Sequence, residues 1–140
     1  MTRIDFYFNV PDKFGRLAEL AGNALSRDRR LFVFVPDRAS SERIGQVLYT
    51  QGQTTFLPHC EADHPLAGET PIIIDWRNEP LPHDDVLVNL CGKHPPFFSR
   101  FKRLIEIVGL DAADRQEARE RFRFYRDRGY EIRSIDVTGG

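Results

Sequence analysis

The stretch ARERFRFYRDRGYEI, from Ala118 to Ile132, concentrates arginines beside aromatic rings. On a helix, residues at positions i, i+4, i+7 and i+11 share one stripe, and here they are Arg115, Arg119, Phe122 and Arg126. Guanidinium forks bind carboxylates through paired hydrogen bonds, while an apolar notch between them can bury a ring. The stripe therefore predicts a binding site for a short acidic peptide that ends in an aromatic residue.

A second stripe on the same helix overlaps the first and consists of Ala118, Phe122 and Tyr125. For Ala118 and Tyr125 we favour core packing, edged by arginines whose stems lie along apolar surface. Acidic neighbours at helical spacing pair with some of the arginines but not with all of them. Direct binding of single-stranded DNA, through phosphate pairing and base stacking, is an alternative use of the same residue types.

Phosphate-binding loops are missing where a nucleotide site would need them. The first strand-to-helix turn, FNVPDKFG, has no GxGxxG pattern. The segment CGKHPP contains Gly92 and Lys93, but a P-loop requires glycine where this chain has Leu87 and Ser or Thr where it has His94. We therefore expect no nucleotide cofactor.

Two clusters contain metal-binding or acid–base residue types. His59, Cys60, Asp63 and His64 suggest zinc, but adjacent His59 and Cys60 are poorly placed to reach one tetrahedral ion, and we expect no metal. The run from His83 through Asp84 to Asp85 lies in a loop without an identified nucleophile. A degenerate nucleotide-dependent hydrolase or nuclease built on that run is the enzymatic alternative.

Cys91 and His94 resemble a catalytic pair only in composition, so we favour a buried thiol at a strand end. The two cysteines, Cys60 and Cys91, lack CxxC spacing and follow no signal peptide, which indicates a reducing cytoplasm. No apolar run approaches the roughly 20 residues that a membrane-spanning helix needs. We expect a cytoplasmic protein without a membrane partner.

Composition limits the whole molecule. A chain of 140 residues predicts one domain over residues 1–140. Twenty basic and twenty-one acidic residues give a net charge of −1, which argues against a protein that grips nucleic acid over its entire surface. Cationic function must therefore be local.

Strand and helix patterns alternate along the chain. Alternation of this kind predicts a mostly parallel sheet covered on both faces, a Rossmann-like three-layer α/β sandwich. The expected strands cover residues 3–8, 31–35, 54–57, 71–76, 85–90 and 130–137. The expected helices cover residues 13–27, 37–52, 97–108 and 111–129, with Asp12, Asp37 and Asp111 as N-caps of the first, second and fourth.

Four segments, in this order, resemble the chi subunit of the bacterial DNA polymerase III holoenzyme: DFYF, FLPHCEADHPLAGETPIIIDW, DVLVNLCGKHPPFFSRFKRLIEIV and ARERFRFYRDRGYEI. The resemblance runs from Asp5 to about Ile135. It implies a non-catalytic member of the clamp-loader assembly with a Rossmann-like fold and no phosphate-binding loop. It also implies binding to the acidic, Phe-terminated C-terminal tail of the single-stranded-DNA-binding protein, so that DNA is reached mainly indirectly.

Further partners implied by the resemblance are a psi subunit, which tethers chi to the clamp loader in some bacteria, and a helicase-like protein in some species. Residue by residue, the family's tail site corresponds to Val108, Arg115, Arg119, Phe122 and Gly129. Phe56, in FLPH, lies in a loop-rich segment where a large apolar residue either packs in the core or anchors a partner, and the resemblance matches it to an aromatic of the psi interface. Tyr49 matches a second partner-binding position. The tail site and the psi surface should be separate, because a linker protein must hold both partners at once.

Overall fold

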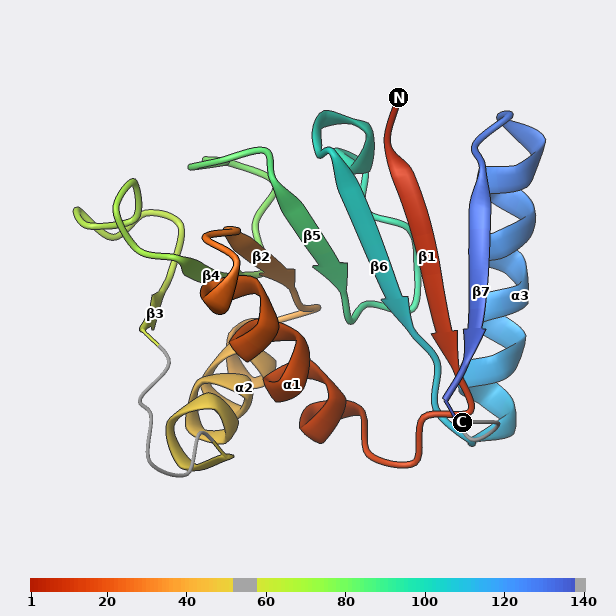
Figure 1. Cartoon of the computed structure of the whole chain (residues 1–140), viewed down its shortest axis with the longest axis horizontal. Helices are drawn as coiled ribbons and strands as arrows, with labels where there is room; N and C mark the ends of the chain where they lie inside the picture. The colour runs from red at the N-terminus through yellow and green to blue at the C-terminus, as the bar shows by residue number, and fades with distance from the viewer. Residues whose placement is uncertain (52–57, 138–140) are drawn as a thin grey trace.

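The computed structural model describes residues 1–51 and 58–137, except for the side chains of residues 49–51. Within these residues, seven strands form one sheet (Figure 1). In chain order the elements are β1 (Arg3–Phe8), α1 (Lys13–Ser26), β2 (Leu31–Phe34), α2 (Arg38–Gln51), β3 (His59–Cys60), β4 (Ile72–Asp75), β5 (Val86–Asn89), the 3₁₀ turn η1 (Phe98–Arg100), β6 (Arg103–Ile107), α3 (Ala112–Asp127) and β7 (Ile132–Asp136). No helix among the described residues is long and apolar enough to cross a bilayer.

Every strand pair in the sheet is parallel, and the strand order is β3-β4-β2-β5-β6-β1-β7. Strands β1, β2 and β6 alternate with helices along the chain, and each parallel return requires a crossover segment. The expected Rossmann-like arrangement is therefore confirmed, with an all-parallel sheet instead of a mostly parallel one.

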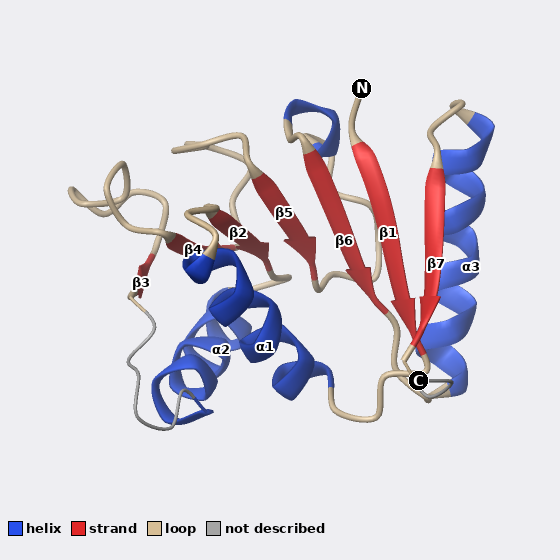
Figure 2. Cartoon of the chain, viewed as in Figure 1, coloured by secondary structure: helices blue, strands red, loops and turns tan. Residues whose placement is uncertain are grey.

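Helices cover the two faces of the sheet unequally (Figure 2). One buried cluster contains Leu17 and Ala21 of α1 with Ile44 and Leu48 of α2, and so lies on their face of the sheet. The other cluster contains Ala118 and Tyr125 of α3 and lies on the opposite face. Helix α3 lies beside β7 at one end of the sheet, as both cartoons show.

The helix boundaries follow from their capping residues. Asp12 accepts a hydrogen bond from the Gly15 amide at 3.1 Å, and Asp37 accepts one from the Ser40 amide at 2.8 Å. Asp111 caps α3 through the Asp114 amide at 3.3 Å. Gly129 follows that helix with a φ of 83°, a left-handed conformation that glycine adopts without a Cβ penalty. All three expected N-caps are confirmed.

The helix expected over residues 97–108 is wrong. That segment forms the 3₁₀ turn η1 and then β6, which pairs with β5 on one side and β1 on the other. In RLIEI the apolar residues do not alternate regularly with polar ones, because this interior strand is buried on both faces, and such a segment cannot be told from a buried helix by periodicity. Val108 consequently follows a strand end.

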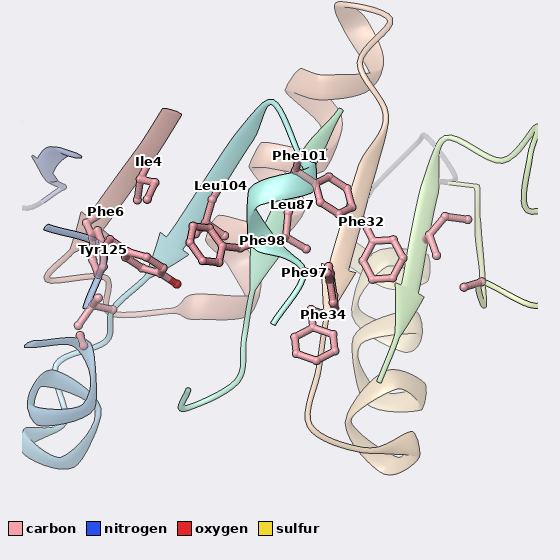
Figure 3. Close-up of a cluster of buried hydrophobic side chains, with 14 of the residues drawn as sticks. Ile4, Phe6, Phe32, Phe34, Leu87, Phe97, Phe98, Phe101, Leu104 and Tyr125 are labelled. Atoms are coloured by element: carbon pink, nitrogen blue, oxygen red, sulfur yellow. The ribbon is translucent and has the colours of Figure 1, made fainter. Parts of the chain in front are cut away.

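Phenylalanines in and beside η1 cover part of the sheet face on which α3 lies. Phe97, Phe98 and Phe101 are each at least 92% buried, and their rings meet those of Phe32 and Phe34 on β2 and of Tyr125 on α3 edge-on (Figure 3). The strand expected at 54–57 lies outside the described residues. The two-residue strand β3, which the sequence did not reveal, comes directly after them.

Candidate functional site

A cavity of about 530 Å³ lies between α3 and the ends of β1, β6 and β7. Of the five residues expected at the tail site, four line it: Val108, Arg115, Arg119 and Phe122. Arg126, the last member of the predicted stripe, lines it too. The remaining lining residues are Phe6, Phe8, Asn9, Ala118, Arg123 and Ser134. The fifth expected residue, Gly129, is not among them; it ends α3 instead.

The cavity has an apolar floor. Phe6 on β1 and Phe122 on α3 meet edge to face with ring centroids 5.4 Å apart. Phe6 and Val108 are both only 4% exposed, so they hold the base of the cavity, whereas Phe122 is half-buried and presents part of its ring. An aromatic ring of a ligand would meet aromatic edges here, an arrangement that rings favour.

Arginines form the rim. Arg115 donates to the amide oxygen of Asn9 at 2.9 Å, and Arg119 donates to Gln116 at 3.2 Å, so both hydrogen-bond to neutral groups. Among the described residues, neither of these arginines nor Arg123 forms an ion pair with a carboxylate. Their positive charges are therefore available to an anionic ligand.

Asn9 connects the rim to the sheet. It has a φ of 61°, which asparagine tolerates better than most residues. Its side-chain amide accepts from Arg115 and donates to Asp136 on β7 at 3.2 Å. Asn9 therefore orients Arg115 without neutralising it.

A buried polar network sets the rotation of α3 on the sheet. Glu106 on β6 is fully buried and accepts hydrogen bonds from Arg121 Nε at 3.0 Å, from the Tyr125 hydroxyl at 2.7 Å and from Asn89. Burial, followed by the adjacent Glu106 carboxylate, raises the pKa of Tyr125 well above its ordinary value, so the hydroxyl remains a donor. With Arg121 and Tyr125 held inward, the stripe that begins at Arg115 must face the cavity.

The five arginines of the opening stretch thus have different uses. Arg121 is only 4% exposed and serves the core, and Arg128 lies over the Phe124 ring at 3.7 Å. Arg119, Arg123 and Arg126 line the cavity. Core packing of Ala118 and Tyr125 is confirmed, since they are 6% and 0% exposed.

Sequence reasoning missed the cavity residues contributed by the strands. Phe6, Phe8 and Asn9 come from the end of β1, and Ser134 comes from β7. Their one visible signal was the alternation along β1, which places Phe6 and Phe8 on the same face. Which face would receive α3 could not be read from the sequence.

The acid–base run at His83 lies in the irregular segment before β5 and has partners within the fold. The His83 ring meets the buried rings of Phe32 and Phe101 edge-on, and its Nδ1 accepts from the Asp85 amide at 3.1 Å. Burial lowers the pKa of His83, which favours the neutral ring. The Asp85 carboxylate accepts from the Arg30 amide at 2.9 Å. These contacts give the run a structural explanation.

The thiol and metal candidates also have other partners. Burial raises the pKa of Cys91 to about 12, and its sulfur lies 3.9 Å from the Phe34 carbonyl oxygen, consistent with a protonated thiol. Asp63 pairs with Arg77 at 2.8 Å, and His64 Nδ1 accepts from the Leu66 amide. No group of three potential metal ligands gathers among the described residues.

Two expected partner residues cannot be placed in a site. Phe56 lies outside the described residues, and Tyr49 lies on α2 with its side chain outside them. Their expected role at a psi interface therefore stays a prediction.

The sequence is similar to known proteins over most of its length. The family model described as DNA polymerase III chi subunit, HolC, matches residues 1–133. This chain belongs to the chi subunit family. The chi subunit of Pseudomonas aeruginosa is 34% identical over 137 residues, covering 94% of each chain. The chi subunit of Escherichia coli is 24% identical over 117 residues, covering 83% of this chain and 80% of the relative.

The chi subunit of Haemophilus influenzae is 28% identical over 121 residues, covering 84% of this chain and 83% of the relative. Among solved structures, the C-terminal domain of the DEAD-box protein Dbp5 aligns with a TM-score of 0.62, covering 98% of this chain and 90% of that one. At 15% identity, this likeness shows the fold alone. The family shows that the chain is of the DNA polymerase III chi type, a replication subunit.

Proposed function

We propose that this chi-family chain is a non-catalytic adaptor whose α3 cavity binds the acidic C-terminal tail of the single-stranded-DNA-binding protein. The tail's last residue, an aromatic one, enters the cavity, and its carboxylates meet the arginine rim. Through a psi subunit, where one is present, the chain links that tail to the clamp loader. The adaptor acts during DNA replication.

One observation carries the proposal: the apolar floor and the unneutralised cations occupy the same cavity. Phe6, Val108 and Phe122 offer rings and aliphatic surface, while Arg115 and Arg119 stand on the rim without carboxylate partners among the described residues. A free C-terminal residue with an aromatic side chain carries both complementary features, a ring and a carboxylate, on one residue. A purely apolar or purely acidic ligand would use only half of the cavity.

The expected binding is modest and sensitive to salt. The cavity admits a few residues of a peptide, so the buried area is much smaller than in a stable protein–protein complex. Exposed charges are screened over about 8 Å at physiological ionic strength. Raising the salt concentration should therefore weaken the complex without abolishing the contribution of the ring.

The psi contact belongs to another surface in this proposal. Tyr49 lies near the end of α2, and Phe56 follows it in the chain. Helix α2 covers the face of the sheet opposite to α3. A partner held there would leave the α3 cavity open, as simultaneous binding requires.

Titration with a fluorescently labelled acidic peptide that ends in phenylalanine tests the tail proposal. Two control peptides separate the contributions: one ends in alanine, and the other carries a C-terminal amide in place of the carboxylate. We expect both controls to bind at least about tenfold more weakly, since each loses a buried ring or a charge-assisted hydrogen bond. Equal binding of all three peptides would exclude tail-end recognition.

A further inference from the structure

A second cavity, of about 670 Å³, opens on the face of the sheet opposite to α3. It lies between the end of α1 and strands β1, β5, β6 and β7. The amino ends of these parallel strands lie together at one end of the sheet (Figure 1). Six basic side chains from the described part of the chain line it: Arg3, Arg27, Arg29, Lys102, Arg103 and Arg133. We call this set the basic cleft. Asp85 is the one carboxylate among the described residues that line it.

The charge of this cleft is not balanced internally. Arg29 lies 3.6 Å from Asp85, and Arg103 and Arg133 share the buried carboxylate of Asp5 at 2.7 and 3.2 Å. Two carboxylates therefore face three arginines. Arg3, Arg27 and Lys102 are exposed, and no ion pair joins them to any described residue. On a chain whose net charge is −1, this is a strong local concentration of positive charge.

Asp5 holds two arginines of the cleft in place. It is fully buried on the same face of the sheet as α1, where Arg103 and Arg133 both donate hydrogen bonds to it. Arg103 also donates to the Tyr7 hydroxyl at 3.3 Å. The shared carboxylate pre-orients two guanidinium groups that still have donors to spare, since each carries five N–H groups.

We propose that the basic cleft binds the phosphodiester backbone of single-stranded nucleic acid. Its apolar lining includes Leu31, Val86 and Ile105, all at most 6% exposed, so the apolar groups form a floor and the charges form the surface. A peptide would need an apolar anchor, as the α3 cavity provides, whereas a polyanion of regularly spaced charges needs only cations. A cavity of about 670 Å³ has room for part of one extended strand.

The binding is led by phosphates and has little sequence preference. Tyr7 is the one aromatic side chain among the described lining residues, so stacking of successive bases contributes little. Strands β1 and β7 carry both cavities on alternate residues: Phe6 and Ser134 face the α3 cavity, while Tyr7 and Arg133 face the basic cleft. A nucleic acid strand and a peptide can therefore be bound at the same time on opposite faces.

The test is a low-salt titration of a fluorescein-labelled oligothymidylate with the full chain. The test variant combines Arg3→Glu, Arg27→Glu and Lys102→Glu, three exposed side chains that form no ion pair with a described residue. We expect this variant to bind the oligonucleotide at least about tenfold more weakly than the wild type. For the wild type we expect a slope of log K against log salt near −2, since about three phosphate contacts would each contribute about −0.7. The matched control combines Arg43→Glu, Lys93→Glu and Arg100→Glu. It changes the net charge by the same amount as the test variant, but outside the cleft, and should bind the oligonucleotide with wild-type affinity.

A second control carries Arg119→Glu and Arg123→Glu in the α3 cavity and should also retain the oligonucleotide. Absence of binding at low salt, or equal loss in the cleft variant and either control, would overturn the proposal. Tighter binding of a poly-glutamate peptide than of the oligonucleotide, lost in the cleft variant, would assign the cleft to an acidic protein segment and also overturn it. The tail-peptide titration is a separate measurement, so failure of one proposal leaves the other standing.

Discussion

Arg121 Nε donates a hydrogen bond to Glu106 Oε1 at 3.0 Å, and both side chains are at least 96% buried. This ion pair joins α3 to the central strand β6, directly behind the cavity that the outward arginines line. Breaking a buried pair by removing one partner leaves an uncompensated charge. The pair therefore links the stability of the fold to the geometry of the candidate site.

The first prediction concerns this pair. Glu106→Ala should lower the free energy of unfolding by about 3–5 kcal/mol, because Arg121 would remain buried and unpaired and the Tyr125 hydroxyl would lose its acceptor. Urea denaturation followed by circular dichroism measures the change. Glu120→Ala, an exposed glutamate on the same helix, should stay within about 0.5 kcal/mol of the wild type. Similar midpoints for the two variants would contradict a structural role for Glu106.

The second prediction separates binding arginines from structural ones. Arg119→Ala should weaken binding of the acidic tail peptide about tenfold and leave the melting temperature nearly unchanged, because the side chain is exposed and, among the described residues, hydrogen-bonds only to Gln116. Peptide titration and thermal denaturation measure the two effects. If the melting temperature fell sharply while affinity held, Arg119 would be a structural residue.

The third prediction concerns Asn9. Asn9→Gly keeps the left-handed backbone but removes the hydrogen bond to Arg115, so tail affinity should fall severalfold. Asn9→Asp should weaken the tail further, because its carboxylate would pair with Arg115 and compete with the ligand. Isothermal titration of both variants checks the order. If Asn9→Asp bound the tail peptide with wild-type affinity, Arg115 would not be part of the binding site.

The fourth prediction tests Gly129, which the family resemblance assigns to the tail site. Gly129→Ala should destabilise the fold by about 1–2 kcal/mol, because alanine is strained at a φ of 83°. Tail affinity should remain unchanged, since Gly129 does not line the cavity. Gly129→Asn, which tolerates this conformation better, should cost less. Loss of affinity in a variant of normal stability would instead place Gly129 at the bound peptide.

The fifth prediction concerns pH. His94 stacks on Phe124 with ring centroids 3.6 Å apart, and burial, followed by the charge of Arg128, lowers the pKa of His94. The unfolded chain therefore takes up a proton first, near its ordinary pKa of about 6.5, and the stability falls as the pH drops below about 7. His94→Phe keeps the stack but cannot titrate, so its melting temperature should fall less between about pH 7 and pH 5. His83, whose pKa is also lowered, leaves a residual dependence in both proteins. Identical pH profiles would exclude His94 as a source.

The sequence by itself determined the features that lie on single elements. The spacing of Arg115, Arg119 and Phe122 places them on one side of any helix, and the capping aspartates mark where the helices begin, because both properties depend on residues a few positions apart. The buried strand Arg103–Ile107 was mistaken for a helix, since its apolar residues show no local period that distinguishes a strand from a helix.

Only the tertiary structure decided which elements meet. Phe6 and Asn9 reach the α3 cavity through β1, and Ser134 reaches it through β7, more than one hundred residues later. The basic cleft likewise brings together Arg3, Lys102 and Arg133, which lie at or near the starts of β1, β6 and β7. Helix periodicity and capping are short-range effects, whereas strand pairing and the choice of a covered face depend on burying apolar surface across the whole chain.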